Sequence, residues 1–206
     1  MPEGHPVFAF AYSWFARMAD KGDMGELRED LLTHAQGTVI EIGAGTGLNL
    51  HHYPAGVEVL ATEPDPHMFR RAEKAARATK GAVTLKRRPA ESLPFSNATV
   101  DTVVSTLVLC SVRDQAVTLA EIGRVLRPGG TLLLIEHVRS EDPALARTQD
   151  KREPTHVRFA GGCHPNRDTL ASVAAAGFDV TAVRRIELQG FKLTRPAIAG
   201  AARKPA

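Results

Sequence analysis

The sequence VIEIGAGTG, residues Val39–Gly47, decides how the rest of this chain is interpreted. Its first part is rich in apolar, β-branched residues (Val39, Ile40 and Ile42), which is typical of a parallel strand covered on both faces. The three glycines that follow favour a sharp turn against which a ligand can lie, because glycine has no Cβ. Leu48-Asn49-Leu50 then predicts a helix whose first N–H groups point into that turn. A tight turn without any ligand is the alternative.

The spacing of these glycines separates two classes of nucleotide site. The dinucleotide fingerprint G-x-G-x-x-G needs a third glycine at position 48 when it is counted from Gly43. Leu48 stands there instead, and the chain reads E-x-G-x-G-x-G from Glu41. This spacing argues against an NAD-dependent oxidoreductase. We keep that class as a competing hypothesis that NADH binding would test.

Composition sets the broad class of protein. The 206 residues suit one α/β domain, residues 1–206, and 43% hydrophobic residues are enough for an ordinary core. A formal net charge of +3 is mild, so we expect no nucleic-acid partner. The two cysteines do not make a disulfide framework and suit a reducing compartment. We find no apolar run of membrane-spanning length and no signal-peptide pattern, and we expect a cytoplasmic protein.

Alternating strand and helix patterns predict an α/β fold. After the glycine turn, strands are expected at 57–62, 83–86, 99–109 and 131–138, with helices at 66–79 and 120–126 between them. The segment Arg124–Gly130 is expected to end the helix at 120–126 and to turn the chain into the fifth strand. A helix at 166–176 precedes two final strands, at 178–183 and 193–202, that form a hairpin.

Residues at the carboxyl ends of the strands are the candidates for ligand contact, because open α/β sheets bind ligands in that crevice. Glu63 closes the strand at 57–62 and can accept hydrogen bonds from both hydroxyls of a ribose. A solvated loop carboxylate is the alternative for Glu63, and Asp65 is a possible substitute. At the end of the fourth strand, Thr106, Leu107 and Val108 face the same crevice.

Four segments, taken in order, resemble the first motifs of class I S-adenosylmethionine (SAM) methyltransferases of the methyltransferase type 11, or ubiquinone–menaquinone methyltransferase-like, group. They are EIGAGTG at 41–47, Glu63 at its strand tip, PAESLPF at 89–95 and RVLRPGG at 124–130. The resemblance covers residues 35–138 and the final hairpin. It implies a Rossmann-like seven-stranded sheet, mostly parallel with an antiparallel terminal hairpin and helices on both faces. It also implies SAM as cofactor, S-adenosylhomocysteine as product, and a structural role for residues 124–130, which set the fifth strand beside the fourth.

A narrower resemblance concerns the methyl acceptor. The segments TLVLCSV at 106–112, EHV at 136–138, GCH at 162–164 with RDT at 167–169, and RPAIAG at 195–200 are similar to the methyltransferase-like 7 family of thiol S-methyltransferases. This implies a small-molecule acceptor, such as a thiol or another lipophilic nucleophile. The membrane-associating segment of that family's animal members is not carried over. A phospholipid or quinone-type methyltransferase and a non-catalytic SAM-binding protein remain alternatives.

The motifs together assign the cofactor to one set of residues. Where many relatives carry an Asp before the Ala of the third segment, this chain has Pro89, so Glu91 is the expected contact to the adenine amino group and Ala90 offers its backbone N–H. The predicted cofactor-binding residues are Glu41, Gly43, Ala44, Gly45, Thr46, Gly47, Glu63, Pro64, Ala90, Glu91, Thr106, Leu107 and Val108.

Fewer sequence features identify the residues that contact the methyl acceptor. By the same resemblance, residues 1–35 form an N-terminal helical lid with Tyr12 and Phe15 as candidate contacts, although aromatic residues there can also simply pack onto the domain. Residues 139–165 are charged and aperiodic and are interpreted as an insertion over the substrate. His137 is the first candidate to orient or deprotonate the acceptor, followed by His156 and His164. A structural role is the alternative for each histidine.

A metal site is not expected from the spacing. Cys110, Cys163, His156 and His164 lack a paired C-x-x-C or H-x-x-x-H signature, so we reject them as a metal set. Methyl transfer from a sulfonium needs no metal.

Overall fold

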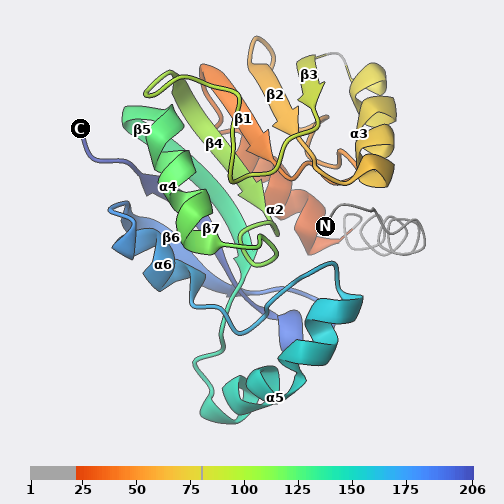
Figure 1. Cartoon of the computed structure of the whole chain (residues 1–206), viewed down its shortest axis with the longest axis vertical. Helices are drawn as coiled ribbons and strands as arrows, with labels where there is room; N and C mark the ends of the chain where they lie inside the picture. The colour runs from red at the N-terminus through yellow and green to blue at the C-terminus, as the bar shows by residue number, and fades with distance from the viewer. Residues whose placement is uncertain (1–21, 80) are drawn as a thin grey trace.

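The computed structural model describes residues 22–79 and 81–206. Within them the chain forms a seven-stranded sheet with the strand order β3-β2-β1-β4-β5-β7-β6 (Figure 1). In chain order, the elements are α2 (Asp23–Leu32), β1 (Thr38–Ile42), β2 (Glu58–Thr62), α3 (Pro66–Ala78), β3 (Ala82–Lys86), β4 (Val100–Thr106), α4 (Gln115–Val125), β5 (Leu126–His137), α5 (Pro143–Phe159), α6 (Thr169–Ala175), β6 (Asp179–Glu187), the 3-10 turn η1 (Lys192–Thr194) and β7 (Pro196–Arg203).

The strand directions confirm the predicted fold class. Strands β1 to β5 pair in parallel, whereas β7 is antiparallel to both β5 and β6. The order of the parallel strands reverses between β1 and β4. In open α/β sheets a ligand binds outside the carboxyl ends of the strands at such a reversal. The loops that leave β1 and β4 therefore define the place to look for a site.

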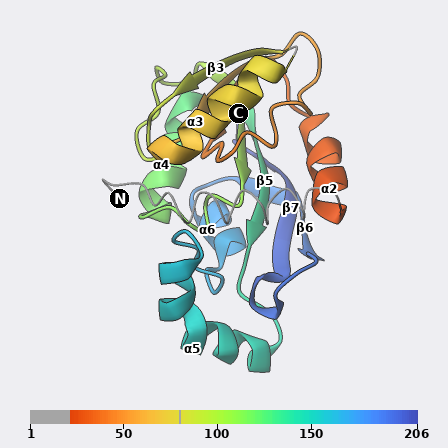
Figure 2. The ribbon, with the colours of Figure 1, turned by 90° about the vertical axis from the view of Figure 1, so that its right-hand side faces the viewer.

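Helices cover both faces of the sheet, as predicted (Figure 2). One apolar cluster joins Ile122 of α4 and Val173 of α6 to one face. The other joins Leu32 of α2 and Ala75 of α3 to the opposite face. These side chains lie on single stripes of their helices, so the central strands are covered on both faces, which explains their nearly continuous apolar sequence.

The RPGG segment is part of β5 rather than a turn before it. Val100 of β4 pairs with Leu126, and the next pair joins Thr102 to Thr131, so the segment between Leu126 and Thr131 bulges out of register. A Cβ on Gly130 would lie 2.9 Å from the carbonyl oxygen of Arg127, which is too close for any other residue. The bulge still sets β5 beside β4, the structural role expected for this segment.

The helix predicted directly after the glycines is not formed. Residues 45–52 make a series of turns, in which Leu50 N–H bonds to the Gly47 carbonyl and His52 N–H to the Asn49 carbonyl. Glycine and asparagine favour turns over helix, and Pro54 follows shortly. The loop therefore has no regular helix whose N-terminus points at a ligand.

The aperiodic residues 139–165, interpreted as an insertion over the substrate, contain a helix that the sequence did not predict. Most of them form α5, a helix that bends along its length and lies beyond the carboxyl ends of β4 and β5 (Figure 1). Pro154 lies inside this helix, where it removes one backbone hydrogen bond and favours a bend. Only Ala146 and Gln149 of α5 are buried, so the helix needs no apolar stripe. That is why its sequence shows no helical periodicity.

Candidate functional site

The loop after β1 carries three glycines, all with positive φ angles. A Cβ on Gly43 would lie 2.7 Å from a methyl carbon of Val108, and a Cβ on Gly47 would lie 2.8 Å from the Cβ of Ala75. A Cβ on Gly45 would meet only the carbonyl oxygen of Gly43, at 3.9 Å, among the described residues within 4 Å. Gly43 and Gly47 are therefore required by packing inside the protein, whereas Gly45 borders open space.

Glu63 lies across from the middle glycine. It follows β2 directly, and its Oε2 accepts a hydrogen bond from the N–H of Gly45 (2.8 Å), while Oε1 accepts one from the N–H of Asp65 (2.8 Å). The hydroxyl oxygen of Thr46 is buried and has no hydrogen-bond partner among the described residues. The open position at Gly45 is thus flanked by a carboxylate and an unsatisfied hydroxyl.

A buried polar network ties the segment after the glycines to β1 and β4. The amide of Asn49 donates to Glu41 Oε1 (3.0 Å) and to Thr106 Oγ1 (2.9 Å). The Tyr53 hydroxyl donates to Glu41 Oε2 (2.8 Å), and Arg28 of α2 donates to Thr106 Oγ1 (3.1 Å). Both carboxyl oxygens of Glu41 are therefore engaged within the protein. Glu41 and Thr106 belong to sequence motifs, whereas their three partners carry no pattern that would identify them.

Burial raises the pKa of the Glu41 and Glu63 carboxyls from 4.5 to about 7. In each group the loss of hydration outweighs the hydrogen bonds that favour the charged form. The pKa in the folded protein is higher than in the unfolded chain. The stabilisation of the fold by these two groups is therefore complete below pH 4.5 and is lost as the pH rises to about 7.

Glu136, a fully buried residue near the end of β5, holds the loop after β4. Its Oε1 accepts hydrogen bonds from the Ser105 hydroxyl (2.6 Å) and from the N–H groups of Val108 and Leu109 (both 2.9 Å). Its Oε2 accepts one from the N–H of Cys110 (3.1 Å). One carboxylate thus fixes the backbone of a loop whose Val108 packs against the glycine loop. Glu136 lies in the EHV segment, but its role in organising this loop was not predicted from the sequence.

Cys110, His137 and Cys163 meet beyond the ends of β4 and β5. The two sulfurs are 3.7 Å apart, and Nδ1 of His137 lies 3.4 Å from the Cys163 sulfur and 3.8 Å from the Cys110 sulfur. The hydrogen bond with Cys163, together with burial, raises the pKa of the Cys110 thiol. The sequence analysis grouped the two cysteines with His156 and His164 and rejected that set as a metal site. In the structure the histidine beside the cysteines is His137 instead.

The other histidine candidates lie apart from this group. His164 Nδ1 contacts Glu153 Oε1 of α5 at 2.6 Å. In His156, also on α5, the Nε2 atom is buried without a hydrogen-bond partner among the described residues, and burial lowers the pKa of the ring. Tyr12 and Phe15 of the predicted lid lie outside the described residues.

The remaining predicted cofactor residues surround the glycine loop unevenly. Ala90 is buried in the cluster that also contains Ile42 and against which the partly buried Val108 packs. Leu107 turns the chain at the end of β4 with a φ of +60°, a conformation that non-glycine residues rarely adopt. Pro64 is exposed and Glu91 is half-buried. Within residues 22–79 and 81–206, no hydrogen bond or ion pair joins the Glu91 side chain to the loop.

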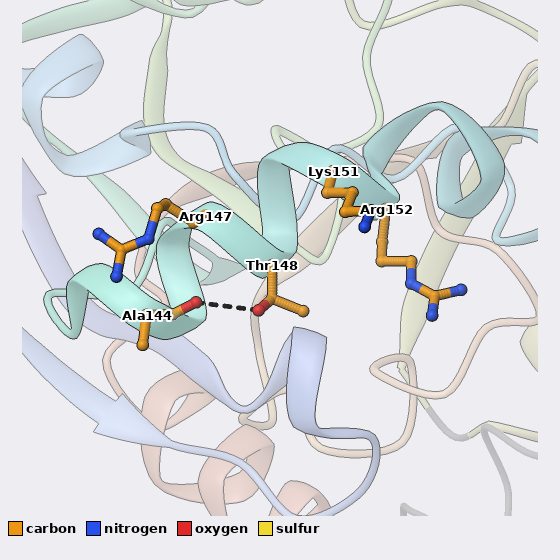
Figure 3. Close-up of a pocket in the computed structure, with 5 residues that line it drawn as sticks. All are labelled: Ala144, Arg147, Thr148, Lys151 and Arg152. Carbon is orange, nitrogen blue, oxygen red and sulfur yellow. Dashed lines mark hydrogen bonds between the residues drawn. The ribbon is translucent and has the colours of Figure 1, made fainter.

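A separate surface hollow lies on α5. It is lined by Ala144, Arg147, Thr148, Lys151 and Arg152, whose three cationic side chains project away from the helix (Figure 3). The Thr148 hydroxyl donates to the Ala144 carbonyl at 2.9 Å, so it is satisfied within the helix. The hollow belongs to one helix surface and contains none of the residues at the ends of β1 and β4.

Among the helices that the structure describes, none combines the length and the apolar character needed to cross a membrane.

Comparison with known sequences gives the family. The profile of a family described as a methyltransferase domain matches residues 40–134, from β1 into β5. Thiol S-methyltransferase TMT1B of Homo sapiens is 36% identical over 161 residues, which cover 75% of this chain and 66% of that protein. Thiol S-methyltransferase TMT1A of Homo sapiens is 32% identical over 173 residues, which cover 81% of this chain and 70% of that protein. The chain thus spans about two thirds of the length of these relatives.

Comparison with solved structures agrees on the fold. A SAM-dependent methyltransferase from Thermotoga maritima, described as a possible histamine N-methyltransferase, superposes with a TM-score of 0.72 over 97% of each chain at 20% sequence identity. At that identity the similarity supports the fold alone, and the family assignment rests on the sequence relatives. The chain belongs to the family of SAM-dependent methyltransferases that includes the thiol S-methyltransferases TMT1A and TMT1B.

Proposed function

We propose that this chain transfers a methyl group from SAM to the sulfur of a small-molecule thiol. The family membership supports the methyl donor, and the printed names of TMT1A and TMT1B support the thiol acceptor. The observation that carries the proposal is the loop at the β1–β4 reversal, where, among the residues that the structure describes, Gly45 alone of the three glycines borders open space.

The residues around Gly45 fit SAM. A backbone without a Cβ lets a nucleoside approach closely, and the buried Thr46 hydroxyl is left with bonding capacity for a ligand. The Glu63 carboxylate has acceptor sites beyond those that Gly45 and Asp65 use, so it can still receive the two ribose hydroxyls. Ala44, Pro64, Ala90, Glu91 and the segment from Thr106 to Val108 complete the proposed contacts.

The work left to the protein is mainly orientation. When bound, SAM supplies a methyl group on a sulfonium, which is already an excellent leaving group. The polar network of Glu41 and the carboxylate of Glu136 hold the two loops that would flank the methyl group. Aligning the acceptor with the methyl and excluding water are the contributions that follow. We propose residues 1–35, with Tyr12 and Phe15, and the α5 region, with His156 and His164, as the cover.

Two measurements test the function. Isothermal titration with SAM, S-adenosylhomocysteine and NADH should show binding of the first two and none of the third. Incubation with SAM and a panel of alkyl thiols, amines, phenols, a quinol and a phospholipid should give S-adenosylhomocysteine and a methyl thioether with the thiols, detected by mass spectrometry. Turnover restricted to another acceptor would replace the thiol assignment. Binding of SAM without turnover across the panel would favour a non-catalytic SAM-binding protein.

The pKa of Glu63 predicts that SAM affinity rises with pH. Ribose hydroxyls donate to the ionised carboxylate, and burial raises the pKa of Glu63 to about 7, so below that pH a proton must leave on binding. We expect the dissociation constant to fall by up to about tenfold per pH unit as the pH approaches 7 and to level off above it. Titration calorimetry from pH 5.5 to 8.5 measures this.

Glu63→Gln is the matched control, because the amide does not titrate in this range. The variant should bind SAM more weakly at pH 8, by about 1–3 kcal/mol, and should lose most of the pH dependence. Glu41 has a similarly raised pKa, to about 7, and stays intact in the variant. An unchanged pH profile in Glu63→Gln would assign the dependence to another group and remove Glu63 from the ribose site.

A further inference from the structure

The atoms of Cys110, His137 and Cys163 are spaced like the ligands of one tetrahedral metal ion. In a zinc site, bonds of about 2.3 Å to sulfur and about 2.0 Å to nitrogen place ligand sulfurs about 3.8 Å apart and sulfur and nitrogen about 3.6 Å apart. The observed separations are 3.7 Å between the sulfurs, and 3.4 and 3.8 Å from Nδ1 to each sulfur. All three ligand atoms lie within 4.8 Å of one another.

The protein backbone holds the two cysteines in place independently of any metal. The N–H of His164 donates to the carbonyl of Cys110 (2.8 Å), which ties the segment after α5 to the loop after β4. At Gly162 a Cβ would lie 3.3 Å from the Ser111 carbonyl oxygen, so a residue with φ of +86° and no side chain lets the two segments approach. Arg167 reinforces the contact by donating to the carbonyls of Leu109 and Val112 at 2.8 and 2.9 Å.

The third ligand is equally fixed. His137 ends β5 and pairs with Ala197 of β7, and the preceding residue is the buried Glu136 that accepts the N–H of Cys110. Two thiols and an imidazole are a donor set that suits zinc, which prefers sulfur and nitrogen ligands. One member, Cys110, lies on the loop that follows β4, and Val108 of that loop packs against the glycine loop. A ligand at this point would therefore be next to the proposed cofactor site.

We propose that Cys110, His137 and Cys163 bind one zinc ion, and that its fourth coordination position receives the thiol acceptor. Zinc sites with three protein ligands keep that position for water or substrate, whereas structural sites fill it with a fourth side chain. The described residues offer three ligands of this kind at the group. In this arrangement His137 acts as a ligand and not as a base, and the chain uses a metal that its sequence spacing did not predict.

The site gives the reaction an activated nucleophile. This part of the inference rests on the proposed function, whereas zinc binding itself does not. A thiol that coordinates zinc loses its proton to solvent and is held as a thiolate. A sulfur electron pair then forms the new bond to the methyl carbon while the methyl–sulfonium bond breaks, and its electron pair stays on S-adenosylhomocysteine. The neutral thioether is a weak ligand and leaves, and zinc keeps its charge throughout.

Metal content is the first test. The untagged 206-residue chain should bind about one zinc ion per molecule after dialysis against metal-free buffer. Replacement by Co²⁺ should give a thiolate-to-cobalt charge-transfer band in the near ultraviolet and intense visible bands of a tetrahedral ion. A protein that binds no zinc, gives no charge-transfer band, or holds Cys110 and Cys163 as a disulfide after purification without reductant would overturn the proposal.

Variants then assign the ligands. Cys110→Ser, Cys163→Ser and His137→Asn should each weaken zinc binding by at least about tenfold and reduce the charge-transfer band. His34→Asn is the control, because His34 is exposed after α2, near the amino end of β1, and should bind zinc like the unaltered protein. The cobalt spectrum of the unaltered protein keeps the test valid if a variant does not fold. Equal zinc affinity in the cysteine variants would contradict the assignment.

Addition of a thiol separates this proposal from the proposed function. An alkyl thiol should shift the visible bands of the cobalt protein, whereas its S-methyl thioether should not. Removal of zinc by a chelator should lower thiol methylation by about tenfold or more, and zinc should restore it. A thiol-induced shift without any methyl transfer would support the metal site and contradict the function. Methylation that persists unchanged in chelated protein and in Cys110→Ser would support the thiol methyltransferase function and contradict the metal site.

Discussion

Gly45→Val is expected to abolish measurable SAM binding while the protein remains folded. The Cβ at this position has open space before it, with the Gly43 carbonyl oxygen 3.9 Å away, so the added side chain would occupy the space proposed for the cofactor. Adding a methylene group to a well-packed site costs about 1–3 kcal/mol. The valine side chain adds three carbon atoms, so we expect a larger loss of binding free energy. Titration calorimetry should show a loss of at least about 100-fold in affinity.

The matched control is Gly56→Val. Gly56 also has a positive φ, +84° against +57° for Gly45, and a Cβ there meets nothing within 4 Å among the described residues. Each variant should therefore be destabilised by the strain of a left-handed backbone, about 1–2 kcal/mol, and neither added Cβ clashes with the described residues. Only Gly45→Val should lose SAM. If both variants bind SAM like the unaltered protein, the cofactor does not lie against the glycine loop.

Glu136→Ala is expected to lower the free energy of unfolding by about 3–5 kcal/mol. The fully buried carboxylate accepts from the Ser105 hydroxyl and from three consecutive backbone N–H groups, those of residues 108 to 110. Its removal leaves these donors unsatisfied in a region closed to bulk water and opens a cavity. Urea denaturation followed by circular dichroism measures the change.

Glu141→Ala, in the segment just after β5, provides the comparison. The Glu141 side chain is 76% exposed and forms an ion pair with Arg185 at 3.2 Å, so its loss should change the unfolding free energy by less than about 1 kcal/mol. Glu136→Gln should fall between the two, because an amide keeps one acceptor oxygen. A Glu136→Ala protein as stable as Glu141→Ala would show that the loop after β4 does not depend on this carboxylate.

The sheet was largely predictable from sequence because its signals are local. The apolar runs around Val39 and Val103, and the glycine spacing after Ile42, each lie within a few residues, and the structure confirms the strands that they predict. The prediction of a helix after Gly47 was wrong because side chains from other parts of the chain stabilise a series of turns in this loop. Here Asn49 is held by Glu41 and Thr106 instead of by a helical ladder.

The group of Cys110, His137 and Cys163 was beyond sequence reasoning for a different reason. Its members come from the loop after β4, the end of β5 and the segment after α5, and they share no spacing that marks a metal site. The sheet order, the hydrogen bond from the His164 N–H to the Cys110 carbonyl, and the close approach of Gly162 to Ser111 bring them together. The residues that hold them, such as Glu136 and Arg167, lie in the segments EHV and RDT, but the sequence does not show what their side chains contact.

The position of β7 has a consequence for how the molecule is made. β7 lies between β5 and β6 although it is synthesised after both, and Ala197 reaches its partner His137 across about sixty residues of intervening chain. During translation, the edge of β5 stays unpaired while α5, α6 and β6 emerge from the ribosome, and β6 is the first strand able to occupy it. If β6 pairs with β5 first, β7 has to displace β6 to reach its native position. Otherwise β7 has to reach β5 before β6 pairs with it. The half of the sheet with the glycine loop can therefore form early, whereas the end of β5 that carries His137 is completed last.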